Sequence, residues 1–183
     1  MIYLASTSPR RKKLLKEAGI RFRALTPRYA EEKALSSPPE KIVKTHALGK
    51  ALSVAHRVKD GTILSADTLV CCRGQVLGKP KNLREAARIL QGLAGRWHTV
   101  YTGVAILRVK KRTVRKKRVF LRKTRIRIRP MSRAAILAYF KKVNPLDKAG
   151  AYAIQSPRAR IVTGMRGSLT NAVGLPMESL GRL

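Results

Sequence analysis

The start of the chain reads as a short strand, a turn of small residues and a helix, and this order constrains the fold more than any other segment. Ile2–Ala5 is apolar, Ser8 stands at an N-cap position with Pro9 directly after it, and Gly19 falls just past the expected end of the helix. A strand that runs through small residues into a helix N-terminus presents backbone N–H groups and the positive end of the helix dipole to an anion. The segment therefore favours an α/β fold with an anion site at this turn.

Arg10 and Arg11 occupy the first turn of this helix, where the dipole favours acidic residues instead. Two guanidinium groups at that position suit a phosphate site, because the planar fork of arginine can bind phosphate oxygens bidentately. A surface helix in a very basic protein explains the same residues. This segment alone leaves both interpretations open.

Helical and strand patterns alternate along the rest of the chain. Strands are expected at 20–25, 62–70, 97–107, 119–121 and 124–129, helices at 40–58, 82–90 and 132–140, and a glycine-punctuated hairpin and a last short helix in the tail. The polar segment 26–39 is expected to be a loop. We therefore predict an α/β fold with a mixed, twisted sheet and flanking helices.

Composition narrows the class of protein further. With 183 residues, 44% of them apolar, the chain can bury a sizeable core, and we predict a single domain over residues 1–183. It carries 41 Lys and Arg against 9 Asp and Glu, a formal charge of +32, which favours polyanions as partners.

No stretch approaches the roughly 20 apolar residues that a membrane-spanning helix needs, and no signal peptide is visible. The adjacent Cys71 and Cys72 are expected to be free thiols in a reducing compartment, which favours the cytoplasm. His46, His56 and His98 have no metal-binding spacing and are interpreted as structural residues.

Asp67 is the strongest candidate for a catalytic or metal-binding residue. It is a lone carboxylate in the otherwise apolar strand 62–70, and burying it is costly unless it is paired, protonated or bound to a metal. The small neighbours Ala66 and Thr68 suit the close approach of a ligand. A carboxylate that caps a turn at the end of the strand is the alternative.

Several short motifs follow one another in a specific order. They are Ser6-x-Ser8-Pro9-Arg10-Arg11, Glu31-Glu32-Lys33, Ala66-Asp67-Thr68, Gly78-Lys79-Pro80, Asp147-Lys148-Ala149-Gly150-Ala151-Tyr152 with Ile154-Gln155, and Val173-Gly174-Leu175-Pro176. With this set the chain resembles the Maf family of nucleoside triphosphate pyrophosphatases over nearly its whole length. The resemblance implies an α/β domain of the Maf/inosine-triphosphatase type, with two lobes around a deep cleft.

The implied reaction cuts a nucleoside triphosphate between its α- and β-phosphates, releasing a monophosphate and pyrophosphate. It implies a divalent metal, cytoplasmic location and a role in clearing surplus or non-standard nucleotides. The Arg10-Arg11 pair and the tract at 147–152 look like the branch of the family that acts on dTTP and UTP, with modified pyrimidine nucleotides as further candidates.

The resemblance also assigns roles to residues. Asp67 looks like the catalytic acidic residue, while Arg10 or Arg11, Thr68 and Gln155 resemble positions that set substrate choice. Glu32 is the second candidate catalytic carboxylate. The remaining candidates for contact with the substrate are charged or polar residues of the same motifs and of the helix at 40–58: Ser6, Lys50, Lys79, Asp147 and Lys148. A carboxylate with an unperturbed pKa is a poor base for free water at neutral pH, so we expect Asp67 and Glu32 to hold Mg²⁺ or Mn²⁺, which lowers the pKa of the attacking water.

The chain also departs from the family pattern. Ala153 and Ser156 stand where the family usually or often has glycine, and a left-handed backbone at Ala153 would displace the loop that carries Gln155. Thirteen of the 22 residues at 108–129 are Lys or Arg, a hairpin that is normally of mixed charge.

Two other classes of function stay open on these grounds: a basic nucleic-acid-binding protein and a catalytically inactive Maf-like module. The first is disfavoured because aromatic residues make up only 5% of the chain and no nucleic-acid-reading motif is present. We expect non-specific affinity for polyanions or nucleic acid as a side property. The sequence leaves monomer and homodimer open.

Overall fold

The computed structural model describes residues 1–30, 37–154 and 160–181. Within them lie the strands β1 (Ile2–Ala5), β2 (Phe22–Leu25), β3 (Gly61–Cys72), β4 (Gln75–Leu77), β5 (Trp97–Lys110), β6 (Thr113–Ile128) and β7 (Val162–Arg166). The α-helices are α1 (Pro9–Glu17), α2 (Pro39–Leu52), α3 (Leu83–Leu93), α4 (Arg133–Phe140) and α5 (Leu169–Val173). Short 3-10 turns follow at η1 (Ala55–Arg57), η2 (Ala149–Ala151) and η3 (Met177–Ser179).

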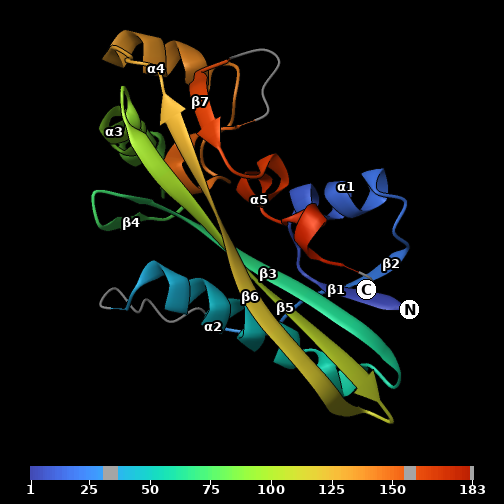
Figure 1. Ribbon diagram of the computed structural model, residues 1–183. Helices are drawn as coiled ribbons and strands as arrows, with labels where there is room; N and C mark the ends of the chain where they lie inside the picture. Colours follow the sequence, from blue (N-terminus) through green and yellow to red (C-terminus); the bar gives the residue numbers. More distant parts are fainter. Residues whose placement is uncertain (31–36, 155–159, 182–183) are drawn as a thin grey trace. The chain divides into compact units, whose positions relative to one another are not determined.

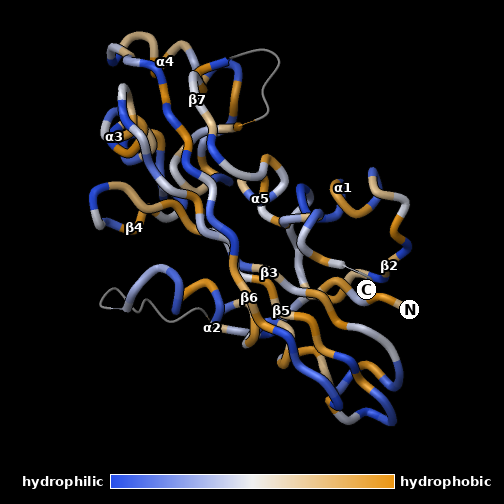
Figure 2. The backbone as a smooth tube through the Cα atoms, viewed as in Figure 1, coloured by the Kyte–Doolittle hydropathy of each residue, from blue (hydrophilic) through white to orange (hydrophobic). Residues whose placement is uncertain are grey.

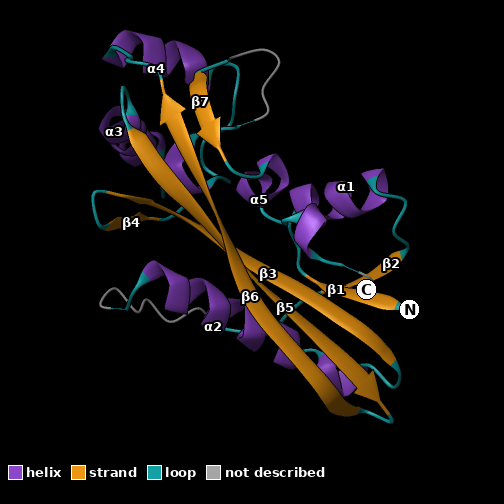
Figure 3. Ribbon diagram, in the orientation of Figure 1, coloured by secondary structure: helices purple, strands orange, loops and turns teal. Residues whose placement is uncertain are grey.

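The strands of the described residues form one mixed sheet in the order β2-β1-β3-β5-β6-β7, with β4 paired to β3 (Figure 1, Figure 3). The predicted α/β fold with a mixed sheet and flanking helices is confirmed. The chain divides into two compact units, each built from separate stretches of sequence. Unit 1 contains Met1–Thr68, Tyr101–Arg122 and Leu169–Leu183, and unit 2 contains Leu69–Val100 and Lys123–Ser168.

In unit 1, β1 pairs in parallel with both β2 and β3. Because side chains alternate along a strand, the two faces of this sheet carry separate apolar clusters. One face packs under α2, with Ala47, Ile63 and Leu107 among its buried residues. The other face packs under α1 and the C-terminal segment, with Leu64 and Leu175 in its core.

The sheet of unit 1 holds α2 at close range. A Cβ atom at Gly103 of β5 would collide with the backbone carbonyl of Val43, so only glycine lets the helix lie this near the strand. Beside this contact, the Ser65 hydroxyl of β3 donates a hydrogen bond to the backbone carbonyl of Ala47. These two contacts fix the part of α2 that carries the candidate site residues.

In unit 2, α3 and α4 pack against each other, and a polar side chain caps the N-terminus of each helix. The Asn82 Oδ1 atom accepts a hydrogen bond from the backbone N–H of Glu85 at 2.8 Å, and the Ser132 hydroxyl accepts from Ala135 at 3.2 Å. These caps confirm the predicted starts of both helices. At the same end of the unit, β7 pairs antiparallel with the last residues of β6.

The boundaries of some elements differ from the prediction. The helix expected at 40–58 ends at Leu52, where the Ser53 hydroxyl donates to the carbonyl of Lys50 and competes with the helical pattern. The strands expected at 119–121 and 124–129 are parts of the single long strand β6. Lys111 and Arg112 form the turn before it with left-handed φ angles of 51° and 62°.

The tail differs as well. The expected hairpin is wrong, because β7 pairs with β6. The short helix expected after Pro176 is present as the 3-10 turn η3, and α5 forms before it. Cys71 and Cys72 are free thiols, as predicted. None of the helices within the described residues has the length and apolar character needed to cross a membrane.

Candidate active site

Asp67 lies in β3 and its carboxylate is paired with a cation on the face covered by α2. The Lys50 Nζ atom lies 2.5 Å from Asp67 Oδ1, and the His46 Nδ1 atom lies 3.5 Å from Oδ2. Both the Lys50 and Asp67 side chains are only 12% exposed. Of the ways to bury a lone carboxylate, the structure uses pairing with a buried ammonium group, and not the capping of a turn.

The helix α2 brings two of these side chains to the carboxylate together. His46 and Lys50 are four residues apart and therefore share one face of the helix. Asp67 faces the helix because it is two residues after Ser65, which bonds to the same helix. Sequence reasoning gave His46 only a structural role, although its i, i+4 spacing from Lys50 was a signal for a shared face.

Arg11 is the centre of a second polar cluster, on the face of β3 that packs under α1. Its Nε atom donates to the Gly174 carbonyl at 2.8 Å, Nη1 donates to the Ser6 hydroxyl at 3.2 Å, and Nη2 donates to the Thr68 hydroxyl at 3.1 Å. One guanidinium thus links the β1–α1 loop, β3 and the segment after α5. This cluster uses the branched shape of arginine, which a lysine cannot reproduce.

The hydrogen bonds of this cluster have one consistent direction. Thr102 donates its hydroxyl proton to the backbone carbonyl of Asn171 at 2.9 Å, so at its 3.0 Å contact with Thr68 it must accept. Thr68 therefore donates to Thr102 and accepts from Arg11. Since a hydroxyl has one proton, Thr68 can only accept a hydrogen bond from any ligand that reaches it.

The turn before α1 is ordered by Ser6. Its buried hydroxyl accepts hydrogen bonds from the backbone N–H of Ser8 and from Arg11, both at 3.2 Å. Ser8 stands at the predicted N-cap position, but its own side chain makes no capping bond. Arg10 lies in the first turn of α1, as predicted, and is half-buried there.

The remaining described candidates belong to unit 2. Lys79 is exposed in the loop between β4 and α3. Lys148 forms an ion pair with its neighbour Asp147 at 2.5 Å and also donates to the backbone carbonyl of Asn144 at 2.9 Å. These interactions hold the Asp147–Lys148 tract in a local turn.

The backbone after this tract answers the question raised by Ala153. Among the described residues, the left-handed positions occupied by residues other than glycine are Arg73, Lys111, Arg112 and Ala151, so Ala153 does not need glycine. The Ala153 N–H instead donates to the Tyr139 hydroxyl at 2.9 Å. The predicted site residues Glu32 and Gln155, and also Ser156, lie outside the described residues.

Unit 2 also buries a titratable pair that sequence reasoning missed. His98 Nε2 and the Tyr152 hydroxyl share a hydrogen bond at 2.7 Å. Burial lowers the pKa of His98 from 6.5 to about 4, and burial raises the pKa of Tyr152 above its usual range. The two residues are 54 positions apart, so no local spacing could reveal the pair.

The described residues offer limited donors for a metal. Within them there is no group of three or more His, Cys, Asp or Glu side chains that could hold a metal ion. The chemistry still fits Mg²⁺, which is typically bound by one or two carboxylates together with substrate phosphates and water. Asp67 is a carboxylate of this kind, with Lys50 already at one of its oxygens.

Comparison with known proteins identifies the family. The family model described as Maf, Maf-like protein, matches residues 1–183, so the chain belongs to the Maf family, as its motifs predicted. A protein named dTTP/UTP pyrophosphatase from Gloeobacter violaceus is 42% identical over 179 residues, which cover 98% of this chain and 92% of that one. A protein of the same name from Moorella thermoacetica is 42% identical over 182 residues, with 100% of this chain and 92% of that one covered.

A solved structure is also similar in part. The Ham1 protein of Staphylococcus aureus aligns with a TM-score of 0.47 and 14% identity, over 87% of this chain and 90% of that chain.

Proposed function

We propose that this protein hydrolyses dTTP and UTP to the nucleoside monophosphate and pyrophosphate, with residues 1–183 acting as a single domain. The observation that carries the proposal is the match to the Maf family over all 183 residues, together with full-length relatives at about 40% identity that are named dTTP/UTP pyrophosphatase. The buried Lys50–Asp67 pair supports it, because it sits at the motif that the family resemblance marks as catalytic.

Binding of the triphosphate is proposed to rest on the cations of the predicted site. Arg11 is fixed by three acceptors, so its guanidinium is oriented before a ligand arrives. Arg10, Lys50, Lys79 and Lys148 add positive charge for the phosphates in this proposal. Ser6 and Asp147 order the turns that carry Arg11 and Lys148.

Asp67 is the residue on which the chemistry depends in this proposal. Together with Glu32 it would bind a divalent cation, Mg²⁺ or Mn²⁺, whose remaining ligands are phosphate oxygens and water. When bound, the cation supplies positive charge to the phosphates and lowers the pKa of an attacking water. Lys50 holds Asp67 in position and offsets the cost of burying its charge.

Selection of the base is proposed to rest on Thr68, Gln155 and the arginine pair. The direction of its hydrogen bonds leaves Thr68 able only to accept from a ligand. The uracil and thymine rings carry an N–H donor on the edge where cytosine has an acceptor, so an acceptor at Thr68 favours UTP and dTTP over CTP. A Thr68→Val variant is expected to reduce this preference.

Further properties belong to the same proposal. We place the enzyme in the cytoplasm as a nucleotide-pool housecleaning hydrolase, either as a monomer or as a homodimer. Non-specific polyanion or nucleic-acid affinity is proposed for the exposed cations of β6 in unit 1, where the Arg118 guanidinium stacks over the Phe120 ring at 4.7 Å. Figure 2 shows the hydrophilic colour at the turn between β5 and β6.

The first experiment measures pyrophosphate release from dTTP, UTP, CTP, GTP and methylated GTP, with Mg²⁺ or Mn²⁺ and with the metal removed by a chelator. Release from dTTP and UTP that requires the metal and is lost in Asp67→Asn is the expected result. Turnover should survive moderate salt, whereas polyanion binding should fall steeply, because it depends on counterion release.

Two outcomes contradict the proposal. The first is a folded protein that releases pyrophosphate from none of the nucleotides. This result would exclude the proposed hydrolysis and favour nucleic-acid binding by the basic surface. The second is full activity in Asp67→Asn, which would leave the proposed reaction intact but show that Asp67 has no catalytic role in it. Unfolding measurements on the same samples separate loss of chemistry from loss of fold.

A further inference from the structure

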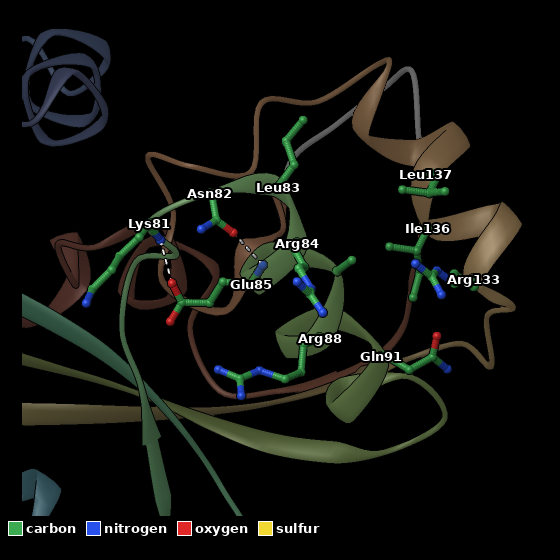
Figure 4. Close-up of a pocket in the computed structure, with 11 residues that line it drawn as sticks. Lys81, Asn82, Leu83, Arg84, Glu85, Arg88, Gln91, Arg133, Ile136 and Leu137 are labelled. Atoms are coloured by element: carbon green, nitrogen blue, oxygen red, sulfur yellow. Dashed lines mark hydrogen bonds between the residues drawn. The ribbon is translucent and has the colours of Figure 1, made fainter.

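A groove of about 850 Å³ lies between α3 and α4 of unit 2, and none of its lining residues belongs to the proposed reaction. Figure 4 shows Arg84 and Gln91 on α3 facing Arg133, Ile136 and Leu137 on α4 across this groove. The groove is formed by the outward faces of two helices, at positions spaced three and four residues apart. Such a surface has the shape that accepts a third helix.

The groove is strongly cationic. Lys81, Arg84, Arg88 and Arg133 line it, and all four side chains are exposed. Within the described part of the chain, the guanidinium groups of the three arginines make no hydrogen bond or ion pair, so no internal acid offsets their charge. Glu85 is the one acid among the lining residues, and its carboxylate is engaged by the backbone N–H of Lys81 at 2.7 Å.

The groove also has an apolar component that phosphate binding does not explain. Leu83 and Leu137 are 54% and 49% exposed, which is high for large apolar side chains, and Ile136, which also lines the groove, is buried. Exposed leucines beside unpaired cations mark a surface that matches an apolar ligand with acidic flanks.

The charge of the chain decides which occupant fits. Residues 69–100 and 123–168, which form unit 2, carry 17 Lys and Arg but only Glu85 and Asp147 as acids. A second copy would therefore place like charges against each other at this groove. The lining contains no aromatic ring on which a nucleic-acid base could stack, so a nucleic acid would leave the leucines unused.

We propose that the groove between α3 and α4 is a docking site for an acidic amphipathic helix of a partner protein. Leucine-type anchors on one face of that helix would pack on Leu83 and Leu137. Asp and Glu beside those anchors would pair with Arg84 and Arg133. The site is independent of the proposed hydrolysis, since none of these residues belongs to the proposed reaction.

The test uses the full-length protein and a fluorescein-labelled helical peptide of about 14 residues, with leucines at helical spacing and glutamates beside them, read by fluorescence anisotropy. Three control probes accompany it: the same peptide with lysine for every glutamate, the same peptide with serine for every leucine, and poly-glutamate. Saturable binding of the first probe alone is the expected result.

Variants locate the binding. The Arg84→Glu/Arg133→Glu double variant should weaken binding by at least about tenfold, since it reverses one charge on each of the two helices that line the groove. Leu83→Ser/Leu137→Ser should weaken it comparably through loss of the apolar anchors. Arg73→Glu, an exposed arginine of unit 2 outside the groove, is the matched control and should change binding by less than about twofold. If the double variant does not fold, the milder Arg84→Gln variant replaces it and should also weaken binding.

Three results would overturn the proposal. The first is no saturable binding at peptide concentrations up to about 1 mM, which is weaker than a specific site should give. The second is equal binding of poly-glutamate, or no effect of the leucine variants, which would make this a general polyanion surface. The third is an equal loss of binding in Arg73→Glu and in the groove variants. Pyrophosphate release measured on the same variants is a separate readout, so failure of either proposal is visible alone.

Discussion

Unit 1 and unit 2 each bury a pair of polar, titratable side chains, and the two pairs differ in charge. In unit 1 the Lys50 ammonium lies 2.5 Å from the Asp67 carboxylate, and both side chains are almost enclosed. In unit 2, His98 and Tyr152 share a hydrogen bond at 2.7 Å. Burial lowers the pKa of His98 to about 4 and raises the pKa of Tyr152, so this second pair is neutral at pH 7.

The difference matters because a neutral hydrogen-bonded pair is the cheaper way to fill a polar position in a core. Two buried charges lose their hydration, and apolar residues of similar volume often replace such a pair with no loss of stability. Packing alone therefore does not explain a buried ion pair in a protein core. The charged pair in unit 1 is therefore a better candidate for a catalytic role than the neutral pair in unit 2.

The largest effect is expected from Asp67→Asn. The variant removes the charge on which the proposed reaction depends, so kcat should fall by at least about a thousandfold. It also leaves the Lys50 ammonium buried without its carboxylate, which should lower the free energy of unfolding by about 3 kcal/mol. Pyrophosphate release and urea unfolding measure the two effects separately.

A double variant tests whether the pair is there for stability. Lys50→Met with Asp67→Leu replaces both charges with apolar groups, so it should recover the free energy of unfolding to within about 1 kcal/mol of the original protein. It should stay inactive. Recovery of activity together with stability would show that the ion pair has no role in the reaction. The buried pairs of the two units would then not differ in function.

Arg11→Lys is expected to have the next largest effect. Lysine keeps the positive charge but cannot reach three acceptors with a planar fork, so kcat/KM should fall by about tenfold to a hundredfold, mainly through a higher KM. Lys13→Arg, on the exposed side of α1, is the matched control for the exchange of these two residue types. An unchanged KM in Arg11→Lys would mean that the cluster around Arg11 serves the fold alone.

His98→Phe should alter the pH dependence of stability. The pKa of His98 is depressed by burial in the folded state, so the unfolded chain takes up a proton first as the pH falls. Neutral His98 therefore contributes to the stability of the folded state in full above pH 6.5. This contribution is lost between pH 6.5 and about 4, which lowers the free energy of unfolding by about 3 kcal/mol.

Urea unfolding at a series of pH values between 7 and about 4 measures this slope, in the range where the two states differ in bound protons. His98→Phe should lose the part of the slope that belongs to this residue, whereas Tyr152→Phe should keep it. Equal slopes in the original protein and in His98→Phe would mean that His98 titrates alike in both states, and the neutral pair would not differ from an exposed histidine.

Local patterns predicted most of the fold. The N-cap and proline signature placed α1, the capping motifs placed α3 and α4, and the apolar run at 62–70 placed β3. The turn of the hairpin at 108–129 was not located at Lys111 and Arg112, because left-handed positions of this kind are typically signalled by Gly, Asn or Asp. The long strand β6 was predicted as two short ones, because the charged residues Arg122 and Lys123 separate the patterns at 119–121 and 124–129.

The candidate site was predictable where a residue is anomalous by itself, and not where its role depends on partners distant in sequence. Asp67 was found because a lone acid in an apolar strand is costly. Its pairing with Lys50 follows from the packing of α2 on the sheet, which Gly103 permits. Likewise, the link from Arg11 to Gly174 spans 163 residues and exists only once the chain has folded.

The smallest effect is expected from Glu17→Gln, which breaks the exposed ion pair between Glu17 and Lys13 on α1. The two side chains are 58% and 74% exposed and their charged atoms lie 3.6 Å apart. Water screens such a pair, so its loss should cost about 0.3 kcal/mol or less, and activity should not change. Urea unfolding of Glu17→Gln and of Asp67→Asn then compares the loss of an exposed carboxylate charge with the loss of a buried one in the same unit. A similar cost for both would mean that burial adds nothing to the Lys50–Asp67 pair.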